Sequence, residues 1–557
     1  MSKKEMISMS KIASGVAIGL MGLSMGYVAP SLASETEIDG FVENATYYRD
    51  GRGISKFRNT LQLEFNKSLQ SANWMNVSIN GTLRGTYDGV YDLNDEEFGK
   101  DATEDYLGAN WHDNTTISSQ MMLTPGTPFP CDNNPTMCSN LNDYMDHDEN
   151  EARFPEFNDE LDFIRELYIS ADKQLDNGNV LNLTFGKQQV VWGKTDLFRV
   201  LDVINPVDYS RHNIFDELED IRIPQWMITA ELQMGANNVF DDSNVSLIWN
   251  IDKFRPNNLG TCGQAYRILD AGCFFASGIP LGPPGSGAPV VPVIHGVEEY
   301  DWELGNTQYG LKWEGVYGDA TFSLNALHYR QQLPSIHFRA NTANPEVPVP
   351  FALDGVFDIH FPEVNLFGGS IDYYAEGMDA VWRLESSYTQ GEELPRDTDG
   401  HKETDMFRYV IGFDKNIIIP ELGTRSAFLF SAQIFGEHIL DHEVDMPNDE
   451  ENWFATLLIK GWYINNRLSP QIIIAHDFAA QATVIAPSIE YLVSDTLKIN
   501  LGLNIKTGGD EQFPWSATAL FGQPGVPQHE PLARFTNGPI GVANQEDEVQ
   551  LTIRYSF

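Results

Sequence analysis

The sequence is poor in cysteine and has no long apolar segment after its amino-terminal part. Only four cysteines occur among 557 residues. The segment from Ile12 to Val28 is apolar. No later stretch holds the roughly 20 consecutive apolar residues that a transmembrane helix requires. The chain is therefore not expected to cross a membrane as a bundle of helices.

Motifs of common hydrolases are also missing from the chain after residue 33. It contains no Gly-x-Ser-x-Gly nucleophile elbow there and no His-Glu-x-x-His zinc pair. The best acid–base candidate is His476-Asp477 near a predicted strand end, and an isolated dyad provides no nucleophile. We therefore expect no enzyme activity, no catalytic residue, no cofactor and no metal.

The four cysteines form two local pairs, Cys131 with Cys138 and Cys262 with Cys273. Both pairs lie in polar stretches that contain proline or glycine. Cysteines of exported proteins commonly form disulfides. Neither pair has the close spacing of a zinc site. We expect two disulfides within exposed loops, with a metal site as the alternative.

The amino-terminal segment has the features of a secretory signal peptide. Lysines precede the apolar run, and Ser31-Leu32-Ala33 offers small residues for cleavage. We expect residues 1–33 to be removed, leaving 34–557, and an uncleaved anchor is the alternative. The formal net charge is −43, which would repel nucleic acid. We therefore expect no nucleic-acid partner.

The last residues of the chain alternate strictly between apolar and polar side chains. Every odd position from Val549 to Phe557 is apolar and every even one is polar. This period of two predicts a β-strand with one apolar face. A terminal strand keeps no free edge if it pairs with the first strand of a barrel. The ending with Tyr555 and Phe557 resembles the assembly signal of bacterial outer-membrane barrels, which implies the barrel assembly machinery as a partner.

The same alternation recurs along the mature chain. In Leu497–Lys506 one face is aliphatic, whereas the other carries Lys, Asn and Gly. Repeated many times, this pattern predicts an apolar exterior around a wet interior. The expected fold is all-β, a single transmembrane antiparallel up-and-down barrel of about 18 strands, with 16 as the alternative. The expected strands are 40–48, 57–65, 77–84, 161–173, 180–191, 224–234, 244–253, 306–316, 320–330, 364–374, 379–390, 405–415, 425–437, 451–464, 470–478, 481–492, 496–507 and 547–557.

Short and long connections alternate between these strands. Transmembrane barrels have short periplasmic turns and long extracellular loops, whereas the turns of tandem soluble β-domains, the alternative, would not alternate in length. We expect the protein in the outer membrane of a Gram-negative bacterium, in contact with its lipids and lipopolysaccharide. Acidic residues at 143–151 lack the ligand spacing of a calcium loop. The expected long outer loops are 88–160, 254–305, 331–363, 391–404, 438–450 and 508–545.

One further connection, 193–223, differs from the other loops. It is less acidic and contains the apolar run Val200–Ile204, which an exposed loop would not keep. We expect it to fold over the mouth or into the lumen as a constriction, where opposite charges orient a passing solute. The alternative is that its charged residues pair to hold a structural loop. The candidate residues are Arg199, Asp202, Asn205, Asp208, Arg211, Asp220 and Arg222.

Sequence around this segment resembles a known family. The stretches are Gly-Lys-Gln-Gln-Val-Val-Trp-Gly at 186–193, Val-Leu-Asp-Val-Ile-Asn-Pro-Val-Asp at 200–208 and Arg-Ile-Pro-Gln-Trp-Met at 222–227. Together with Arg-Glu-Leu-Tyr at 165–168 and the terminal strand, they resemble domain-of-unknown-function family 1302, uncharacterised Gram-negative outer-membrane barrels. The resemblance implies no catalytic residues. It suggests partnership with inner-membrane exporters and with soluble periplasmic carriers of hydrophobic molecules.

The combined prediction is an outer-membrane channel or conduit for a small hydrophobic or amphipathic molecule, as the partner of an inner-membrane exporter. One alternative is a substrate-specific uptake porin for organic acids or similar nutrients. Another is a non-conducting surface-binding or scaffold barrel. The lumen distinguishes them, because an apolar lining favours lipid-like solutes, a ladder of Arg and Lys favours anions, and a filled lumen favours a scaffold.

Overall fold

The structure is a computed structural model. The residues that it describes are 36–72, 75–99, 149–195, 198–211, 218–260, 264–266, 279–281, 288–290, 292–298, 300, 302–339, 355–396, 400–444, 446, 448–479, 481–508 and 547–557. Among these residues, no helix is long and apolar enough to cross a membrane.

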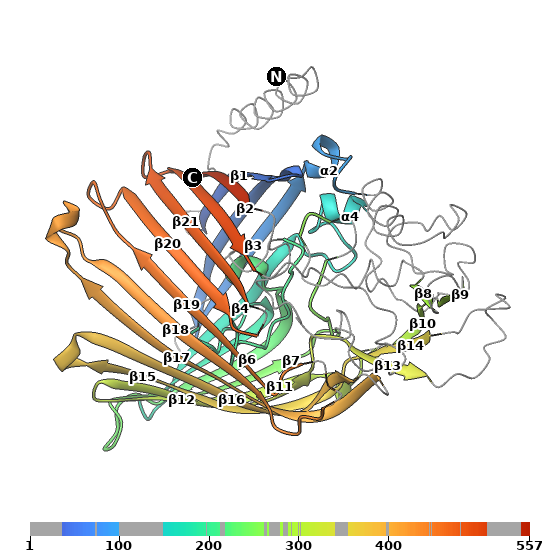
Figure 1. The fold of residues 1–557 in the computed structure, drawn as a ribbon. Helices are drawn as coiled ribbons and strands as arrows, with labels where there is room; N and C mark the ends of the chain where they lie inside the picture. The colour runs from blue at the N-terminus through green and yellow to red at the C-terminus, as the bar shows by residue number, and fades with distance from the viewer. Residues whose placement is uncertain are drawn as a thin grey trace.

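Eighteen strands form one antiparallel sheet that closes into a barrel (Figure 1). Each strand pairs with the next strand of the sheet along the chain, and the first pairs with the last. The expected all-β, up-and-down barrel of 18 strands is therefore confirmed. The strands are β1 (Thr36–Arg49), β2 (Gly53–Ala72), β3 (Met75–Asp88), β4 (Ile164–Gln174), β5 (Val180–Gln188), β6 (Gln225–Gln233), β7 (Asp242–Asn250), β11 (Gln308–Tyr317), β12 (Ala320–Arg330), β15 (Glu363–Ala375), β16 (Ala380–Arg396), β17 (Gly400–Ile417), β18 (Phe428–Ile439), β19 (Glu451–Lys460), β20 (Leu468–Asp477), β21 (Ala482–Leu492), β22 (Leu497–Thr507) and β23 (Glu548–Ser556).

The seam between β1 and β23 runs to the last residue of the chain. The Phe557 amide donates to the Gly40 carbonyl at 2.9 Å, and the Gly40 amide donates to the Phe557 carbonyl at 3.0 Å. Arg554 Nε lies 2.6 Å from a carboxylate oxygen of Glu43 on the neighbouring strand. The carboxy-terminal strand therefore leaves no free edge in the barrel.

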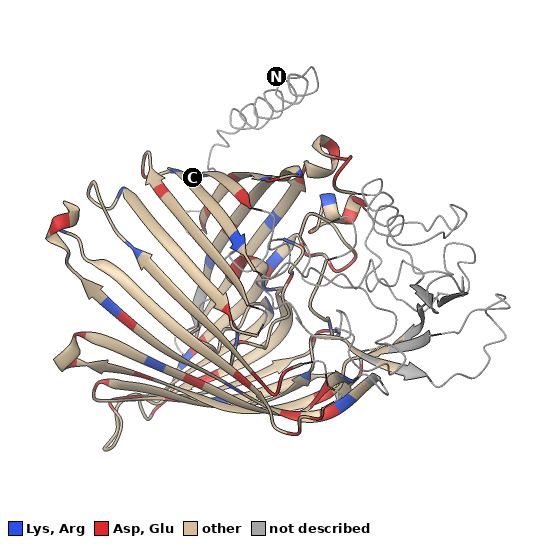
Figure 2. Ribbon diagram, viewed as in Figure 1, with Lys and Arg blue, Asp and Glu red and all other residues tan. Residues whose placement is uncertain are grey.

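The two faces of the barrel wall differ in polarity. Leu324 and Leu501 are more than half exposed, whereas Asn325 and Gln433 are buried. In Figure 2 charged residues occupy only a small part of most strands. A wall with apolar side chains outside and polar ones inside is the arrangement of a transmembrane barrel.

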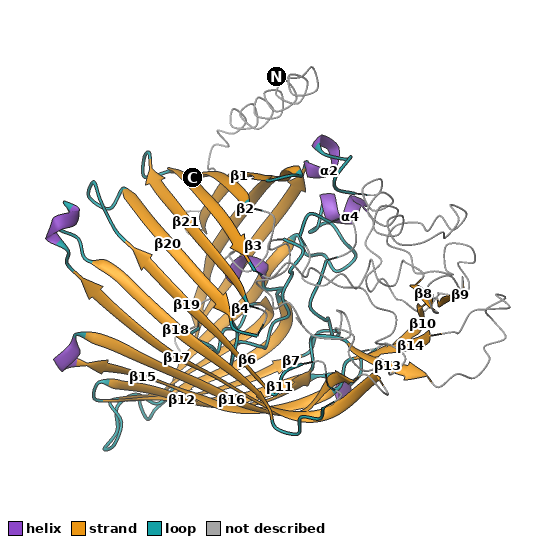
Figure 3. Ribbon diagram, viewed as in Figure 1, coloured by secondary structure: helices purple, strands orange, loops and turns teal. Residues whose placement is uncertain are grey.

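The connections at the two ends of the barrel differ in length. At one end the longest is the ten-residue β17–β18 connection, 418–427, whereas the other end carries 89–163, 189–224, 251–307, 331–362 and 508–547. Among the described residues, the helices are short pieces in these connections (Figure 3). The remaining elements are α2 (Val90–Leu93), α4 (Glu149–Arg153), α5 (Leu218–Ile221), the 3-10 helices η2 (Leu304–Asn306), η3 (Glu376–Met378) and η4 (Pro420–Leu422), and the short strands β8 (Ile279–Leu281), β9 (Ala288–Val290), β10 (Pro292–Val297), β13 (Ser335–Arg339) and β14 (Gly355–His360).

One expected long loop, 391–404, is instead the tip of a hairpin. Strands β16 and β17 pair as far as Arg396 and Gly400. The register shifts between Thr389 and Glu392, and Gly391 has a φ of +82°, which is typical of a β-bulge. Polar residues on both faces hid the strand in the sequence, because the alternation disappears where a hairpin has no apolar side.

Candidate functional site

The connection between β5 and β6 packs against the inner wall of the barrel. Val200, Leu201 and Ile204 are at most 4 % exposed. Their burial follows from the apolar run, which cannot stay in water without cost. The segment therefore packs in one apolar cluster with residues of wall strands β6, β7, β12, β15, β17 and β18. The wall residues in this cluster are Met227, Ile248, Leu327, Tyr329, Val364, Leu366, Val410 and Phe435.

Two wall glycines allow this close approach. A Cβ atom added at Gly368 would lie 2.5 Å from a methyl carbon of Leu201, and one at Gly310 would lie 2.6 Å from the Trp192 ring. Trp192 itself is 3 % exposed. Its position next to the expected strand 180–191 predicts an aromatic at a lipid interface, but the structure buries it inside the barrel. Strand β5 ends at Gln188, so Trp192 belongs to the inward-turning segment.

A buried ion pair and a buried amide join the two ends of the segment. Arg222 donates from Nε to Asp202 Oδ2 at 2.8 Å and also from Nη2 to the same oxygen. Asn205 is fully buried. Its Oδ1 accepts from the Val190 amide at 2.8 Å, and its Nδ2 donates to the Ile223 carbonyl at 2.9 Å. These contacts satisfy polar groups that burial would otherwise leave unpaired.

Asp208 and Arg211 form a second cluster, nearer to the long-loop end. Arg211 donates to Asp208 Oδ2 at 3.2 Å and to Glu156 Oε1 at 2.5 Å. Burial raises the pKa of the Glu156 carboxyl, but the charge and hydrogen bond of Arg211 outweigh that effect and hold the pKa below its ordinary value. Glu156 thus stays ionised and fixes Arg211.

The remaining two candidates contact the barrel wall and an adjoining connection. Asp220 accepts from Arg84 Nη2 of β3 at 2.7 Å. Arg199 donates to the Asn205 carbonyl at 2.7 Å and to Gln332 Oε1 at 3.0 Å. The structure therefore brings the seven candidates together as separate anchored groups and not as one ring.

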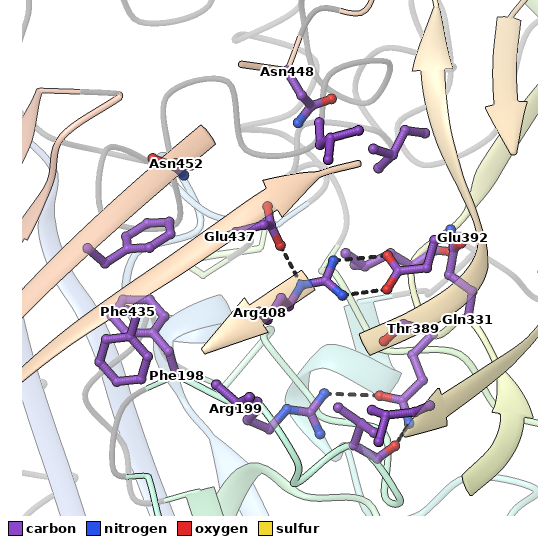
Figure 4. Close-up of a pocket in the computed structure, with 18 of the residues that line it drawn as sticks. Phe198, Arg199, Gln331, Thr389, Glu392, Arg408, Phe435, Glu437, Asn448 and Asn452 are labelled. Carbon is purple, nitrogen blue, oxygen red and sulfur yellow. Dashed lines mark hydrogen bonds and ion pairs between the residues drawn. The ribbon is translucent and has the colours of Figure 1, made fainter. Parts of the chain in front are cut away.

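A cavity of about 510 Å³ lies between the segment and the wall (Figure 4). Its apolar part includes Phe198, whose ring centroid is 5.2 Å from that of Phe435 and 4.9 Å from that of Phe454. Leu366 and Leu394 lie in the same lining. The volume is in the range of sites for small organic molecules.

The polar part of this cavity centres on Arg408 of β17. Its guanidinium binds both carboxylate oxygens of Glu392, one at 2.9 Å, and donates from Nε to Glu437 at 2.5 Å. Figure 4 shows these three side chains opposite Phe198 and Phe435. Two carboxylates hold the Arg408 guanidinium and compensate its positive charge. The cavity therefore has an apolar surface on one side and this ion-paired group on the other.

Sequence reasoning missed the wall residues of this cavity. Arg408 and Glu437 occupy directly opposite positions on β17 and β18. Opposite charges at inward positions of successive strands are a usable signal, but only once the register is known. Of the seven candidates from the segment, Arg199 lines the cavity.

A second cavity of about 410 Å³ lies nearer to the long loops and is more strongly charged. Arg255 binds both carboxylate oxygens of Asp162, at 2.8 and 2.7 Å. Arg165 and Arg211 also line it. Two of these three arginines, Arg255 and Arg211, therefore form ion pairs with carboxylates.

Other sequence candidates lie elsewhere. Tyr555 and Phe557 are exposed on the outer face at the end of β23. The two cysteine pairs lie outside the described residues, as does most of the acidic run 143–151.

Comparison with known proteins places the chain in a family. Among solved structures it is similar to OccK3 (OpdO) of Pseudomonas aeruginosa, with 10% identity, a TM-score of 0.42 and coverage of 95% of this chain and 97% of that chain. It is also similar to OccAB2 of Acinetobacter baumannii, with 11% identity, a TM-score of 0.39 and coverage of 94% and 98%. A third is the outer membrane channel DcaP of Acinetobacter baumannii, with 8% identity, a TM-score of 0.35 and coverage of 94% and 97%.

No curated protein matches the chain. The family model described as "Protein of unknown function (DUF1302)" matches residues 19–557. This match confirms the resemblance seen around the inward-folded segment. The chain belongs to the DUF1302 family.

Proposed function

We propose that this protein is an outer-membrane channel for a small hydrophobic or amphipathic molecule, and that 193–223 forms its constriction. The observation that carries the proposal is the cavity between this segment and the wall, with Phe198 and Phe435 on one side and Arg408 on the other (Figure 4). The apolar band around the barrel fits contact with outer-membrane lipids and lipopolysaccharide.

The lining favours an amphipathic solute over an inorganic anion or a small organic anion without a hydrocarbon chain. A channel for anions needs cations that are free to attract them. Here Arg408 is held by Glu392 and Glu437. The lining carries the three carboxylates of Glu392, Glu437 and Asp449 against the two guanidinium groups of Arg199 and Arg408, so it has no excess of positive charge. The apolar surface opposite would bind a hydrocarbon portion, while the hydrogen-bonding groups around Arg408 would orient a polar end.

The anchored segment would act as a fixed constriction rather than a mobile gate. The Asp202–Arg222 pair and the packing of Leu201 hold it against the wall. In this proposal the seven candidate residues position the segment, and passage depends on size and wetting.

A solute of this kind is poorly soluble in the periplasm. Its passage would need delivery to the short-turn end, which supports a soluble periplasmic carrier and an inner-membrane exporter as partners. Transport in the opposite direction is the alternative, in which an uptake porin takes organic acids. Arg165 of the second cavity, which donates to the neutral Glu219 carbonyl, favours that alternative.

Single-channel conductance of the purified barrel in planar bilayers tests the proposal. A variant with a short Gly-Ser linker in place of 193–223 is expected to conduct several-fold more than the unmodified protein, because the segment fills part of the lumen. The matched control carries the same linker in place of 418–427, at the other end, and should leave conductance unchanged.

Solute block identifies the molecule that passes. A medium-chain fatty acid should reduce the current, and Leu366→Glu should weaken this block about tenfold by placing a charge in the apolar lining. Succinate should not block. Protein-free membranes control for direct effects of the fatty acid.

Each result has a definite meaning. No conductance with or without 193–223 would leave only the non-conducting scaffold. Equal conductance and ion selectivity in both forms would reject the constriction. Block by succinate and not by the fatty acid would replace the proposed solute with an organic acid.

A further inference from the structure

Three potential metal ligands converge at the long-loop end of the barrel. They are His337 of β13, Glu393 of β16 and His401 of β17. One ligand atom from each residue lies within 4.8 Å of the others. The three come from separate strands, and two of these strands belong to the protruding hairpin of the barrel wall.

The side chains are already in contact with one another. A nitrogen of His337, Nε2, lies 2.6 Å from Glu393 Oε2. The rings of His337 and His401 stack at a centroid distance of 3.5 Å and an angle of 6°. All three are partly exposed, so an ion from solvent can reach the cluster.

A further histidine and carboxylate support this arrangement. The ring of His360, at the end of β14, stacks on His337 at 3.9 Å. Its Nδ1 lies 2.7 Å from Glu298 Oε2. Groups that hold a ligand ring in place support a metal site, and His360, itself held by Glu298, would be such a group for His337.

The donor set selects a class of metal. Two imidazole nitrogens with one carboxylate match the ligands of Zn²⁺ and similar divalent transition metals, whereas Ca²⁺ and Mg²⁺ prefer oxygen ligands. Zn²⁺ binds nitrogen and oxygen at about 2.0–2.2 Å in a tetrahedron, which sets ligand atoms about 3.4 Å apart. The donor atoms lie within 4.8 Å of one another, so no pair needs to close by more than about 1.5 Å, and the His337–Glu393 pair would open slightly. Water or a further ligand would complete the coordination.

We propose that His337, Glu393 and His401 bind a divalent transition metal ion of the Zn²⁺ class. The ion would join the β13–β14 hairpin to the tips of β16 and β17. Such a link would stabilise an outer connection without using the lumen, so the site is independent of what the barrel conducts.

Calorimetric titration of Zn²⁺ into the full-length, tag-free barrel in detergent tests the site. We expect one ion per chain. His401→Ala should weaken binding about 100-fold and Glu393→Gln at least about tenfold, since each removes a ligand. The matched control is His328→Ala, because this ring on β12 lies against Tyr309 and outside the cluster.

Hydrogen exchange provides a second readout that does not depend on the variants folding. Zn²⁺ should slow exchange of the β13 amides, 335–339, in the unmodified protein. The proposal is overturned if the unmodified protein binds no Zn²⁺ in stoichiometric amount. It is also overturned if a folded His337→Ala/His401→Ala variant binds Zn²⁺ as tightly as the unmodified protein.

Discussion

Asp202 and Arg222 lie 20 residues apart in the chain and meet in the interior of the barrel. Both are at most 6 % exposed. A buried charge is tolerated only when it is paired, so each of the two requires the other. This pair is therefore expected to anchor the segment between β5 and β6 where it returns to the wall.

Arg222→Met should loosen the segment, because Asp202 would remain buried without its cation. Removing one partner of a buried pair costs about 3–5 kcal/mol. Hydrogen exchange of the amides at 200–204 should accelerate accordingly.

The double variant Asp202→Leu/Arg222→Met is the control for this prediction. Replacing both charges by apolar groups costs far less than replacing one. Equal exchange in the single and double variants would show that the ion pair does not anchor the segment.

The candidate site was predictable at this scale only in part. The mixed charges of 193–223 marked Asp202 and Arg222 as a group, but nothing local indicates that one pairs with the other. Arg408 stood out even less, because its partner Glu437 lies on another strand and Glu392 lies beyond a bulge. Side chains that meet across a barrel are related by register and closure, which a single stretch of sequence does not contain.

At the scale of elements, the segment and the wall fit through small residues. Gly310 lies beneath Trp192, and Gly368 lies beneath Leu201. Close packing leaves no room for added atoms at such contacts. The position of the segment therefore depends on wall strands β11 and β15 as much as on its own sequence.

Gly310→Ala should displace Trp192, because the added Cβ would lie 2.6 Å from the indole ring and 2.8 Å from Leu327. Overpacking of this kind costs about 1–3 kcal/mol. Faster hydrogen exchange in the segment, with an otherwise folded barrel, is the expected result.

Gly305→Ala is the matched control, since no atom lies within 4 Å of a Cβ added there. If Gly310→Ala leaves exchange as slow as Gly305→Ala does, Trp192 does not pack as described.

The strands themselves were predictable from alternation. Each of the 18 expected ranges overlaps a wall strand. The ends of the strands were harder to predict. A strand that extends beyond the bilayer, as β16 does past Thr389, needs no apolar face.

At the scale of the whole molecule, stability depends on closure. Without β23, the edges of β1 and β22 would both have unpaired backbone groups, which are costly in lipid. Deletion of 548–557 should therefore abolish the compact, heat-modifiable form seen on unheated SDS gels after refolding in detergent.

Phe557→Ala is the matched comparison. It keeps the two backbone hydrogen bonds to Gly40, so it should still refold in detergent. If its ring serves as an assembly signal, the variant should accumulate poorly only in cells. Failure to refold in detergent would mean that the ring is needed for the seam itself.

The sequence by itself determined the class of fold, the approximate number of strands and the polarity of each face. These follow from a local rule, because a strand with lipid on one side and a polar interior on the other must alternate with a period of two. The terminal strand from Val549 to Phe557 contains that rule in full.

Only the tertiary structure decided which charges pair, where the cavity lies and which histidines meet. Strand register and a bulge bring Arg408 to Glu392. The return of an outer connection brings His337 to His401. These are long-range relations, fixed when the barrel closes, and no local pattern specifies them.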